Sequence, residues 1–353
     1  MRNIVLTGGG TAGHVYPALA IWEDLEPNFN GHYIGSGGME KDIVQKVPSL
    51  TFHQIDAVKL VRKITLKNFL IPFKLLNAIH QAKKLLKEIK PCVIFSKGGF
   101  VAVPVVIAGA SLGIPIVSHE SDLSIGLANK IILKYCKVMC TSFEKTALVN
   151  KKCVYTGQPI RRLVLSGNKN NLLFLNLFDK KKKNLLVVGG SSGAKFINEM
   201  VWKNIDQICA LYNVIHLCGK KASKNVTHSC YKQVDYAENM GDYLAWADFV
   251  LSRAGSGAIN EFLALNKPML LIPLSKKCSR GDQIENARLF QNLKIADMIE
   301  EENCDDQMFI IKLKNLHAKE DEYKKNMKKI AKPSPNQKII EIINQVAMKE
   351  TKQ

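Results

Sequence analysis

The chain has 353 residues, more than a single hydrophobic core usually supports, so we expect two domains of roughly 150 to 180 residues each. Hydrophobic residues make up 46% and charged residues 23% of it, proportions typical of a globular protein, and no apolar run approaches the ~18 residues of a membrane-spanning helix. The formal net charge of +19 favours a polyanion, an anionic bilayer surface or a phosphate-bearing ligand. Nine cysteines without a C-x-x-C pair argue against a disulfide framework or a zinc site.

Short apolar segments that end near a glycine alternate along the chain with segments of helical periodicity. Apolar runs at 4–6, 93–95, 185–188 and 249–251 each precede a glycine, and residues 75–89 have a helical pattern. Such alternation predicts parallel sheets built from βαβ units. The two halves of the chain also repeat one plan, in which a glycine turn, an apolar segment, a proline and a strand follow one another. We therefore predict an α/β protein with two doubly wound, Rossmann-like domains facing a central cleft.

Loop-forming residues place the domain boundary in the middle of the chain. We assign residues 1–160 to an N-terminal domain and residues 161–335 to a C-terminal domain. Pro333 and Pro335 set apart a final helical segment, 336–353, which could pack back on the first domain.

The sequence Gly8-Gly9-Gly10-Thr11-Ala12-Gly13-His14 follows directly after the first predicted strand. Glycines there let backbone amides approach a ligand that side chains would keep away. The spacing fits the dinucleotide motif G-x-G-x-x-G, but the second predicted strand ends in Gly35-Ser36-Gly37-Gly38, without the acidic residue that takes a ribose in such enzymes. The loop therefore favours another ligand that carries sugar and phosphate.

Three loops of the second half offer groups for phosphate or sugar. Residues 189–194 are small and open into a helix, which suits a diphosphate, although an ordinary strand-to-helix turn explains them equally well. Glu261 could accept both hydroxyls of a ribose or merely favour the helix dipole. Amide and acid groups around Gln283 suit sugar hydroxyls.

Polar residues also follow the predicted strand 116–118, at the sheet edge where His14 lies. His119, Glu120 and Asp122 are there, and imidazoles and carboxylates that converge on a cleft are candidate general bases. The alternative is that these groups only cap the end of the strand.

Taken together, these motifs resemble the MurG family of N-acetylglucosaminyltransferases, within glycosyltransferase family 28. The resemblance covers nearly the whole chain, through the segments 8–14, 96–100, 119–122, 126–130, 157–161, 189–194, 252–261 and 282–287 in this order. It implies a GT-B fold and an inverting transfer of GlcNAc from UDP-GlcNAc to the C4 hydroxyl of N-acetylmuramyl-pentapeptide carried on undecaprenyl diphosphate. The first domain would then bind the acceptor and the second UDP-GlcNAc.

The resemblance also implies roles for individual residues. The UDP diphosphate would meet Ser191, Ser192 and the glycine amides up to Gly193, with Arg161 nearby, while Glu261 would take the ribose. The remaining contacts implied with UDP-GlcNAc are Thr11, Ala12, Gly13, Asp122, Ala237 beside the uracil, Ser256, Gly257, Ala258 and Gln283. His14 is our first choice for the base or for positioning the acceptor, with Glu120 and Asp122 as alternatives. Because amides and Arg161 would hold the leaving group, we expect no obligatory metal or other cofactor.

Three positions depart from the family pattern. Asp122 stands where many members have Asn, which weakens a donor-sugar contact carried over from them. Ala12 replaces a frequent Gly, and Phe100 replaces a Tyr found in some members.

Residues 67–90 predict contact with a membrane. Phe69, Phe73, Leu76 and Ile79 are interleaved with lysines such as Lys74, a composition typical of a surface that lies on anionic lipid. The segment matches the bilayer-docking patch of the family, which implies a peripheral protein on the cytoplasmic face of the cell membrane. An amphipathic helix with its apolar side in the core explains residues 75–89 equally well.

Two other functions are compatible with parts of the sequence. One is a GT-B lipid glycosyltransferase that moves a sugar from a UDP-sugar to diacylglycerol. The other is a basic module that binds nucleic acid, but only the net charge favours it, because aromatic residues make up 7% of the chain and form no stacking platform. We therefore expect no nucleic-acid partner, and the sequence does not specify partners among other cell-wall synthesis proteins.

Overall fold

A computed structural model of the chain describes residues 1–57, 71–190, 193–220, 222–277, 279, 281–331 and 334–349. The chain divides into two compact units, Met1–Arg161 with Pro333–Gln353, and Arg162–Lys332. The first unit thus includes Arg161, which the sequence had assigned to the second domain. Three residues of the predicted site, Phe69, Ser191 and Ser192, lie outside the described residues.

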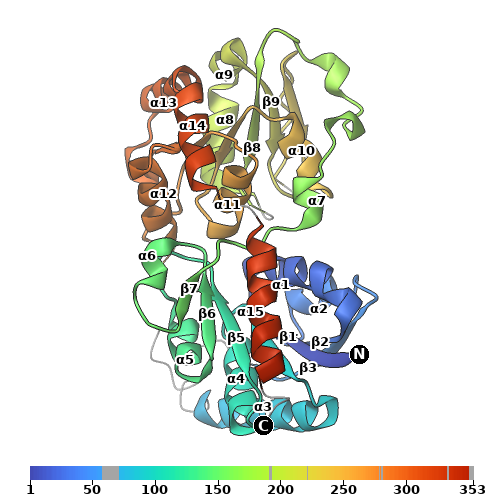
Figure 1. Cartoon of the computed structure of the whole chain (residues 1–353). Helices are drawn as coiled ribbons and strands as arrows, with labels where there is room; N and C mark the ends of the chain where they lie inside the picture. The colour runs from blue at the N-terminus through green and yellow to red at the C-terminus, as the bar shows by residue number, and fades with distance from the viewer. Residues whose placement is uncertain are drawn as a thin grey trace. The chain divides into compact units, whose positions relative to one another are not determined.

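The first unit is built on a parallel sheet, with seven strands among the described residues in the order β3-β2-β1-β4-β5-β6-β7 (Figure 1). The strands are β1 (Arg2–Thr7), β2 (Phe29–Gly35), β3 (Leu50–Gln54), β4 (Val93–Ser96), β5 (Ile116–Glu120), β6 (Val138–Thr141) and β7 (Cys153–Tyr155). The helices are α1 (Ala12–Leu25), α2 (Met39–Val44), α3 (Ile71–Ile89), α4 (Ala102–Ser111), α5 (Leu127–Tyr135), α6 (Glu144–Ala147) and α15 (Pro335–Lys349). Side chains on both faces of the central strands are buried; their apolar residues form the core, and their polar residues, such as Thr7, Ser96 and His119, lie toward the carboxyl ends of the strands.

The second unit has a parallel sheet of the same plan, with six described strands in the order β10-β9-β8-β11-β12-β13. They are β8 (Lys183–Val188), β9 (Tyr212–Leu217), β10 (Tyr231–Val234), β11 (Phe249–Ser252), β12 (Met269–Leu271) and β13 (Ala296–Met298). The helices are α7 (Arg162–Leu165), α8 (Lys195–Lys203), α9 (Ile205–Leu211), α10 (Met240–Trp246), α11 (Ser256–Ala264), α12 (Asp282–Asn292), α13 (Asp306–Ala318) and α14 (Glu320–Ile330).

Both sheets reverse their strand order at one place, which confirms the predicted doubly wound architecture. The reversal lies between β1 and β4 in the first unit and between β8 and β11 in the second. In sheets of this kind, ligands bind where the order reverses, outside the carboxyl ends of the strands. The loops that follow these four strands contain the glycine motifs, so the topology selects them as the candidate site.

The C-terminal helix α15 is part of the core of the first unit. It runs alongside α1 (Figure 1), and its side chains Ile339, Ile343 and Ala347 are buried in the same apolar cluster as Trp22. Asn336, in its first turn, accepts a hydrogen bond from the Ile160 backbone N–H at 3.0 Å and donates to the carbonyl oxygens of Ile160 and of Ala20 in α1. The last segment therefore completes the domain with which the chain begins.

Among the described residues, no helix combines the length and the apolar character needed to cross a bilayer.

We expect Ile343→Ala to lower the free energy of unfolding of the first unit by about 2–5 kcal/mol, because it opens a cavity in the cluster shared by α1 and α15. Gln345→Ala, an exposed position two residues further along the same helix, is the matched control and should change stability little. Urea denaturation of the full chain measures both. Equal midpoints for the two variants would contradict a core role for α15.

Candidate functional site

Two side chains, one from β2 and one from α2, hold the glycine loop between β1 and α1 in shape. The Tyr33 hydroxyl donates to the Gly8 carbonyl oxygen at 2.7 Å. The buried Glu40 carboxylate accepts the Ser36 backbone N–H at 2.9 Å and the Gly10 backbone N–H at 3.4 Å, and it also accepts the Ser36 hydroxyl. An acidic residue thus does follow the second strand, but its oxygens bind the protein's own loop.

A second glycine loop, between β4 and α4, packs directly against the first. Gly99 has a positive φ of +80°, and a Cβ atom there would lie 2.5 Å from the Gly9 carbonyl oxygen and 3.3 Å from Nδ1 of His14. Any side chain at this position would force the two loops apart. The loops after β1 and β4 are therefore one interlocked surface at the place where the strand order reverses.

His14 lies in the first turn of α1, and Thr11 orients its ring. Thr11 is the residue before the helix, and its Oγ1 lies 2.9 Å from His14 Nδ1. When Nδ1–H donates to this hydroxyl oxygen, the Nε2 atom keeps its lone pair, which is the tautomer that can accept a proton. The half-buried imidazole is thus suited to act as a general base.

The predicted bases His119 and Glu120 lie inside the protein. β5 extends two residues beyond the predicted strand and includes both of them; His119 is 0% and Glu120 5% exposed. The Glu120 carboxylate accepts the backbone N–H groups of Asp122 and Gly126, each at 3.0 Å, and the side-chain amide of Asn129 at 2.9 Å.

Both carboxylate oxygens of Glu120 therefore hold the 120–126 turn, which argues against its expected role as a base. His119 is hydrogen-bonded through both ring nitrogens, to Lys97 and to the Gly157 carbonyl oxygen. Burial lowers the pKa of His119 well below its usual value, so its imidazole is uncharged at neutral pH. Asp122, half-buried, follows at the end of this segment.

Arg161 stacks on the helix that carries His14. Its guanidinium carbon lies 4.3 Å from the ring centroid of Tyr16, two residues after His14. Its Nε atom is buried and has no hydrogen-bond partner in the part of the chain that the structure describes. The Arg161 cation is thus held against α1 by its contact with Tyr16.

In the second unit, the glycine loop after β8 packs on the end of β9. A Cβ atom on Gly193, where φ is +76°, would lie 2.0 Å from the Cys218 carbonyl oxygen. The Gly193 N–H donates to the Gly190 carbonyl oxygen at 3.0 Å, so this amide closes the turn, which argues against its expected contact with the diphosphate. The absence of a side chain at Gly193 is what lets the loop pack against the Cys218 carbonyl oxygen.

A buried polar network supports this loop. Asn198 donates to the Cys218 carbonyl oxygen at 2.8 Å, and its Oδ1 lies 3.0 Å from Nε2 of His216, whose Nδ1 lies 3.0 Å from the Tyr231 hydroxyl. Burial lowers the pKa of His216 to about 4. His216 is therefore neutral at physiological pH and donates through Nε2 to Asn198.

The remaining predicted residues of the second unit lie at the starts of α11 and α12. Ser256, Gly257 and Ala258 form the first turn of α11, where backbone N–H groups have no partner within the helix, and Glu261 follows one turn later. Gln283, in the first turn of α12, accepts the Leu274 N–H at 3.0 Å through its side-chain oxygen. Its amide nitrogen is thus the group that could donate to a sugar. Ala237 is buried after the end of β10.

Over the described ranges, no group of three or more His, Cys, Asp or Glu side chains is arranged to hold a metal ion.

Comparison with known proteins decides the family. Residues 4–141 match the glycosyltransferase family 28 N-terminal domain, and residues 184–343 match the family 28 C-terminal domain. The chain belongs to glycosyltransferase family 28. The predicted family is thereby confirmed.

Two family 28 relatives illustrate how far the similarity extends. The UDP-N-acetylglucosamine--N-acetylmuramyl-(pentapeptide) pyrophosphoryl-undecaprenol N-acetylglucosamine transferase of Clostridium botulinum is 45% identical over 350 residues, which cover 97% of this chain and 99% of the relative. The protein of the same name from Clostridium tetani is 41% identical over 349 residues, 97% of each chain.

Solved structures share the fold. The match with the crystal structure of Acinetobacter baumannii MurG includes 98% of this chain and 100% of the MurG chain, with a TM-score of 0.77 and 24% sequence identity. The match with the crystal structure of the glycotransferase of kitacinnamycin includes 99% of this chain and 98% of the other, with a TM-score of 0.72 and 13% sequence identity. The predicted GT-B fold is confirmed.

Reasoning from the sequence missed three side chains that shape the family 28 loops: Glu40, Lys97 and His216. Their only signal was a charged or imidazole group close to a glycine motif or within an apolar strand. Such a position does not reveal what the side chain contacts in the fold.

Proposed function

We propose that the chain transfers GlcNAc from UDP-GlcNAc to the C4 hydroxyl of N-acetylmuramyl-pentapeptide on undecaprenyl diphosphate, with inversion, in peptidoglycan synthesis. The observation that carries this proposal is the 45% identity, over 97% of the chain, to relatives whose name states this donor and this acceptor. The arrangement of His14 within interlocked glycine loops fits a sugar hydroxyl as the acceptor.

In the proposed reaction, Nε2 of His14 accepts the proton of the C4 hydroxyl as its oxygen attacks C1 of GlcNAc. The bond from C1 to the diphosphate oxygen breaks, and UDP leaves with the electron pair. In this reactive tautomer Nδ1–H of His14 donates to the Thr11 hydroxyl oxygen, which orients the ring. Charge that develops on the diphosphate is stabilised by Arg161, which the structure holds against Tyr16.

The second unit is proposed to hold the donor. Glu261 accepts the ribose hydroxyls, and the first turn of α11 faces phosphate with its amides. Ser191 and Ser192 belong to the same proposed nucleotide site. In this scheme amides and Arg161 neutralise the leaving group, so no metal or other cofactor is obligatory.

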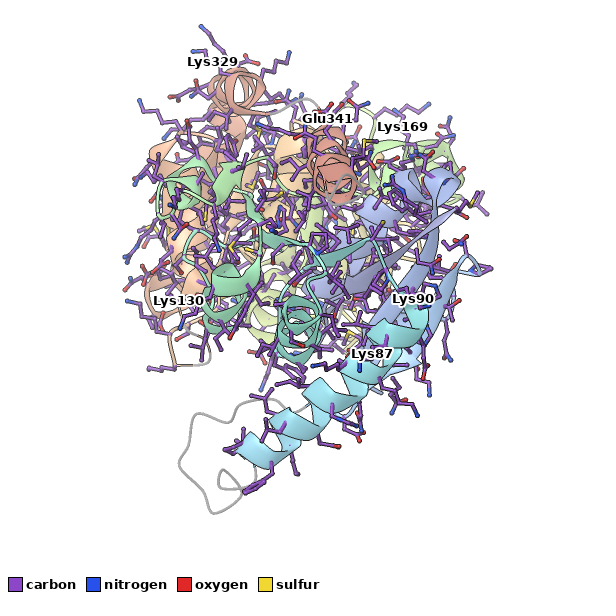
Figure 2. All side chains as sticks on the ribbon, turned by 60° about the horizontal axis from the view of Figure 1, so that its bottom comes forward. Lys87, Lys90, Lys130, Lys169, Lys329 and Glu341 are labelled. Carbon is purple, nitrogen blue, oxygen red and sulfur yellow. The ribbon has the colours of Figure 1, made fainter. Side chains whose placement is uncertain are left out.

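We also propose that the first half of α3 docks on an anionic membrane surface on the cytoplasmic side of the cell membrane. The helix turns Ala78, Ala82 and Leu86 into the core, whereas Phe73 is 71% and Leu76 63% exposed. Figure 2 shows the N-terminal end of α3 extending beyond the core that its second half covers, where Lys87 is labelled.

The exposed Lys74 lies next to Phe73, so apolar and basic groups are available together, as binding to anionic lipid requires. Ile79 is partly buried and packs against the core, so it offers less surface to lipid than Phe73 and Leu76 do.

The acceptor tests the proposed reaction. Purified protein with UDP-GlcNAc should release UDP when given undecaprenyl-diphospho-N-acetylmuramyl-pentapeptide and should release none above background with diacylglycerol. A coupled UDP assay measures both. UDP release with diacylglycerol alone would instead support a glycolipid-forming enzyme, and release with neither acceptor would contradict both activities.

Three variants compared side by side test the base. We expect His14→Ala to lower kcat by about 10²- to 10⁴-fold, as loss of a general base does, with affinity for UDP-GlcNAc within about twofold of wild type. Asp122→Asn should lower kcat only slightly. Glu120→Gln should lower thermal stability along with activity, because an amide nitrogen would face N–H donors in the 120–126 turn. A loss of kcat with Asp122→Asn as large as with His14→Ala would contradict the assignment of the base to His14.

Vesicle sedimentation tests the docking surface. Phe73→Asp combined with Lys74→Glu should reduce binding to vesicles rich in phosphatidylglycerol by about tenfold or more, because it replaces an apolar and a basic group with acidic ones. Leu148→Asp, at a position 82% exposed in the same unit, is the matched control and should bind like wild type. Unchanged binding of the double variant, or an equal loss in the control, would contradict docking through α3.

A further inference from the structure

Lys97, directly after β4, is a buried cation that the proposed reaction has not used. It is 1% exposed, and its Nζ lies 2.8 Å from Nδ1 of His119 and donates to the hydroxyl of Ser121. His119 is fully buried, and its Nε2 lies 3.0 Å from the carbonyl oxygen of Gly157. A chain of hydrogen bonds therefore joins the end of β4, the end of β5 and the loop after β7.

The chemistry of the donor groups fixes the direction of these hydrogen bonds. An ammonium group has donors and no acceptor, so Nδ1 of His119 must accept from Lys97. The proton of the neutral imidazole is then on Nε2, which donates to the Gly157 carbonyl oxygen. Burial and the neighbouring Lys97 charge both lower the pKa of His119, so the ring does not take a second proton. One arrangement of protons satisfies all these groups.

This network fixes two segments that carry proposed site residues. On one side, Lys97 donates to the hydroxyl of Ser121. The next residue is Asp122, and its backbone N–H donates to the Glu120 carboxylate. On the other side, His119 anchors Gly157, four residues before Arg161. Lys97 also adjoins the first glycine loop, because a Cβ on Gly8 would lie 3.1 Å from the Cβ of Lys97.

We propose that Lys97 is a positioning residue for glycosyl transfer, which acts through His119 and Ser121 to hold the Asp122 and Arg161 segments at the acceptor-side loops. The activity part of this inference rests on the proposed function. The arrangement of protons on His119 does not, and it is measured without substrate.

The charge of Lys97 makes the network sensitive to pH. Burial lowers the pKa of Lys97 to about 8, while the carboxylates of Glu120 and Asp122 oppose that shift. Above pH 8 the neutral amine gains a lone pair and can also accept, so the directions of its hydrogen bonds with His119 and Ser121 are no longer fixed, and the positive charge that faces Glu120 and Asp122 is lost. The wild-type rate should therefore fall on the alkaline side with a midpoint near pH 8.

The first experiment uses the wild-type chain labelled with ¹⁵N-histidine, with the His119 signals identified through His119→Gln. We expect the Nε2–H tautomer, with no titration from pH 5.5 to 7.5. Either the Nδ1–H tautomer or titration in this range would overturn the proposed network.

The second experiment compares Lys97→Met with Lys152→Met. The control lysine lies in the same unit and donates to the carbonyl oxygens of Leu133 and Lys134 at the end of α5, away from the network. We expect Lys97→Met to lower kcat about 100-fold, the loss typical of a small misplacement of reacting groups, with affinity for UDP-GlcNAc within about twofold of wild type and no alkaline midpoint near pH 8.

Lys152→Met should keep the wild-type rate and pH profile. A folded Lys97→Met with a rate equal to that of Lys152→Met would overturn the positioning role. If Lys97→Met does not fold, the wild-type pH profile and the His119 tautomer still decide the inference. Wild-type transfer to the lipid acceptor is measured first, so failure of the proposed function is recognised separately from failure of the role of Lys97.

Discussion

The close approach of two backbone turns is the constraint on which the first unit depends. The loops after β1 and β4 leave the sheet side by side, because the strand order reverses between these strands. They interlock so closely that a Cβ on Gly99 would meet the Gly9 carbonyl oxygen at 2.5 Å. His14 and Thr11 are positioned by this surface, and the buried Glu40 and Tyr33 support it from below. The glycines of the motif are thus needed for the packing of the two loops as well as for access by a ligand.

Both units place buried polar groups beneath their glycine loops. In the first unit these are Glu40 and the Lys97–His119 pair, and in the second they are His216 and Asn198. Burial of such groups is unfavourable unless each finds hydrogen-bond partners. Each of these side chains has such partners, and each chain of hydrogen bonds ends on a backbone atom of a loop or strand end next to the site. The same physical solution is used twice, with different residues.

The C-terminal helix shows how the two units share one chain. The last segment returns from the second unit and fills the apolar side of the first sheet next to α1. Asn336 ties this return to Ile160, at the point where the chain first leaves the unit. The first unit therefore includes residues that follow the second unit in the sequence, and its stability depends on them.

The sequence by itself determined the fold class, the repeated plan of the two halves and the positions of the glycine loops. These follow from local patterns, because apolar runs and glycines act over a few neighbouring residues, and the ordered motifs indicated the family. Only the tertiary structure decided that Glu120 and His119 are buried hydrogen-bonding groups, that Gly193 uses its amide within a turn, and that Ile79 packs, partly buried, against the core. It also revealed Glu40, Lys97 and His216, whose partners lie on other strands and helices. The role of a polar side chain is set by its burial and its partners, and these exist only once distant segments have packed together.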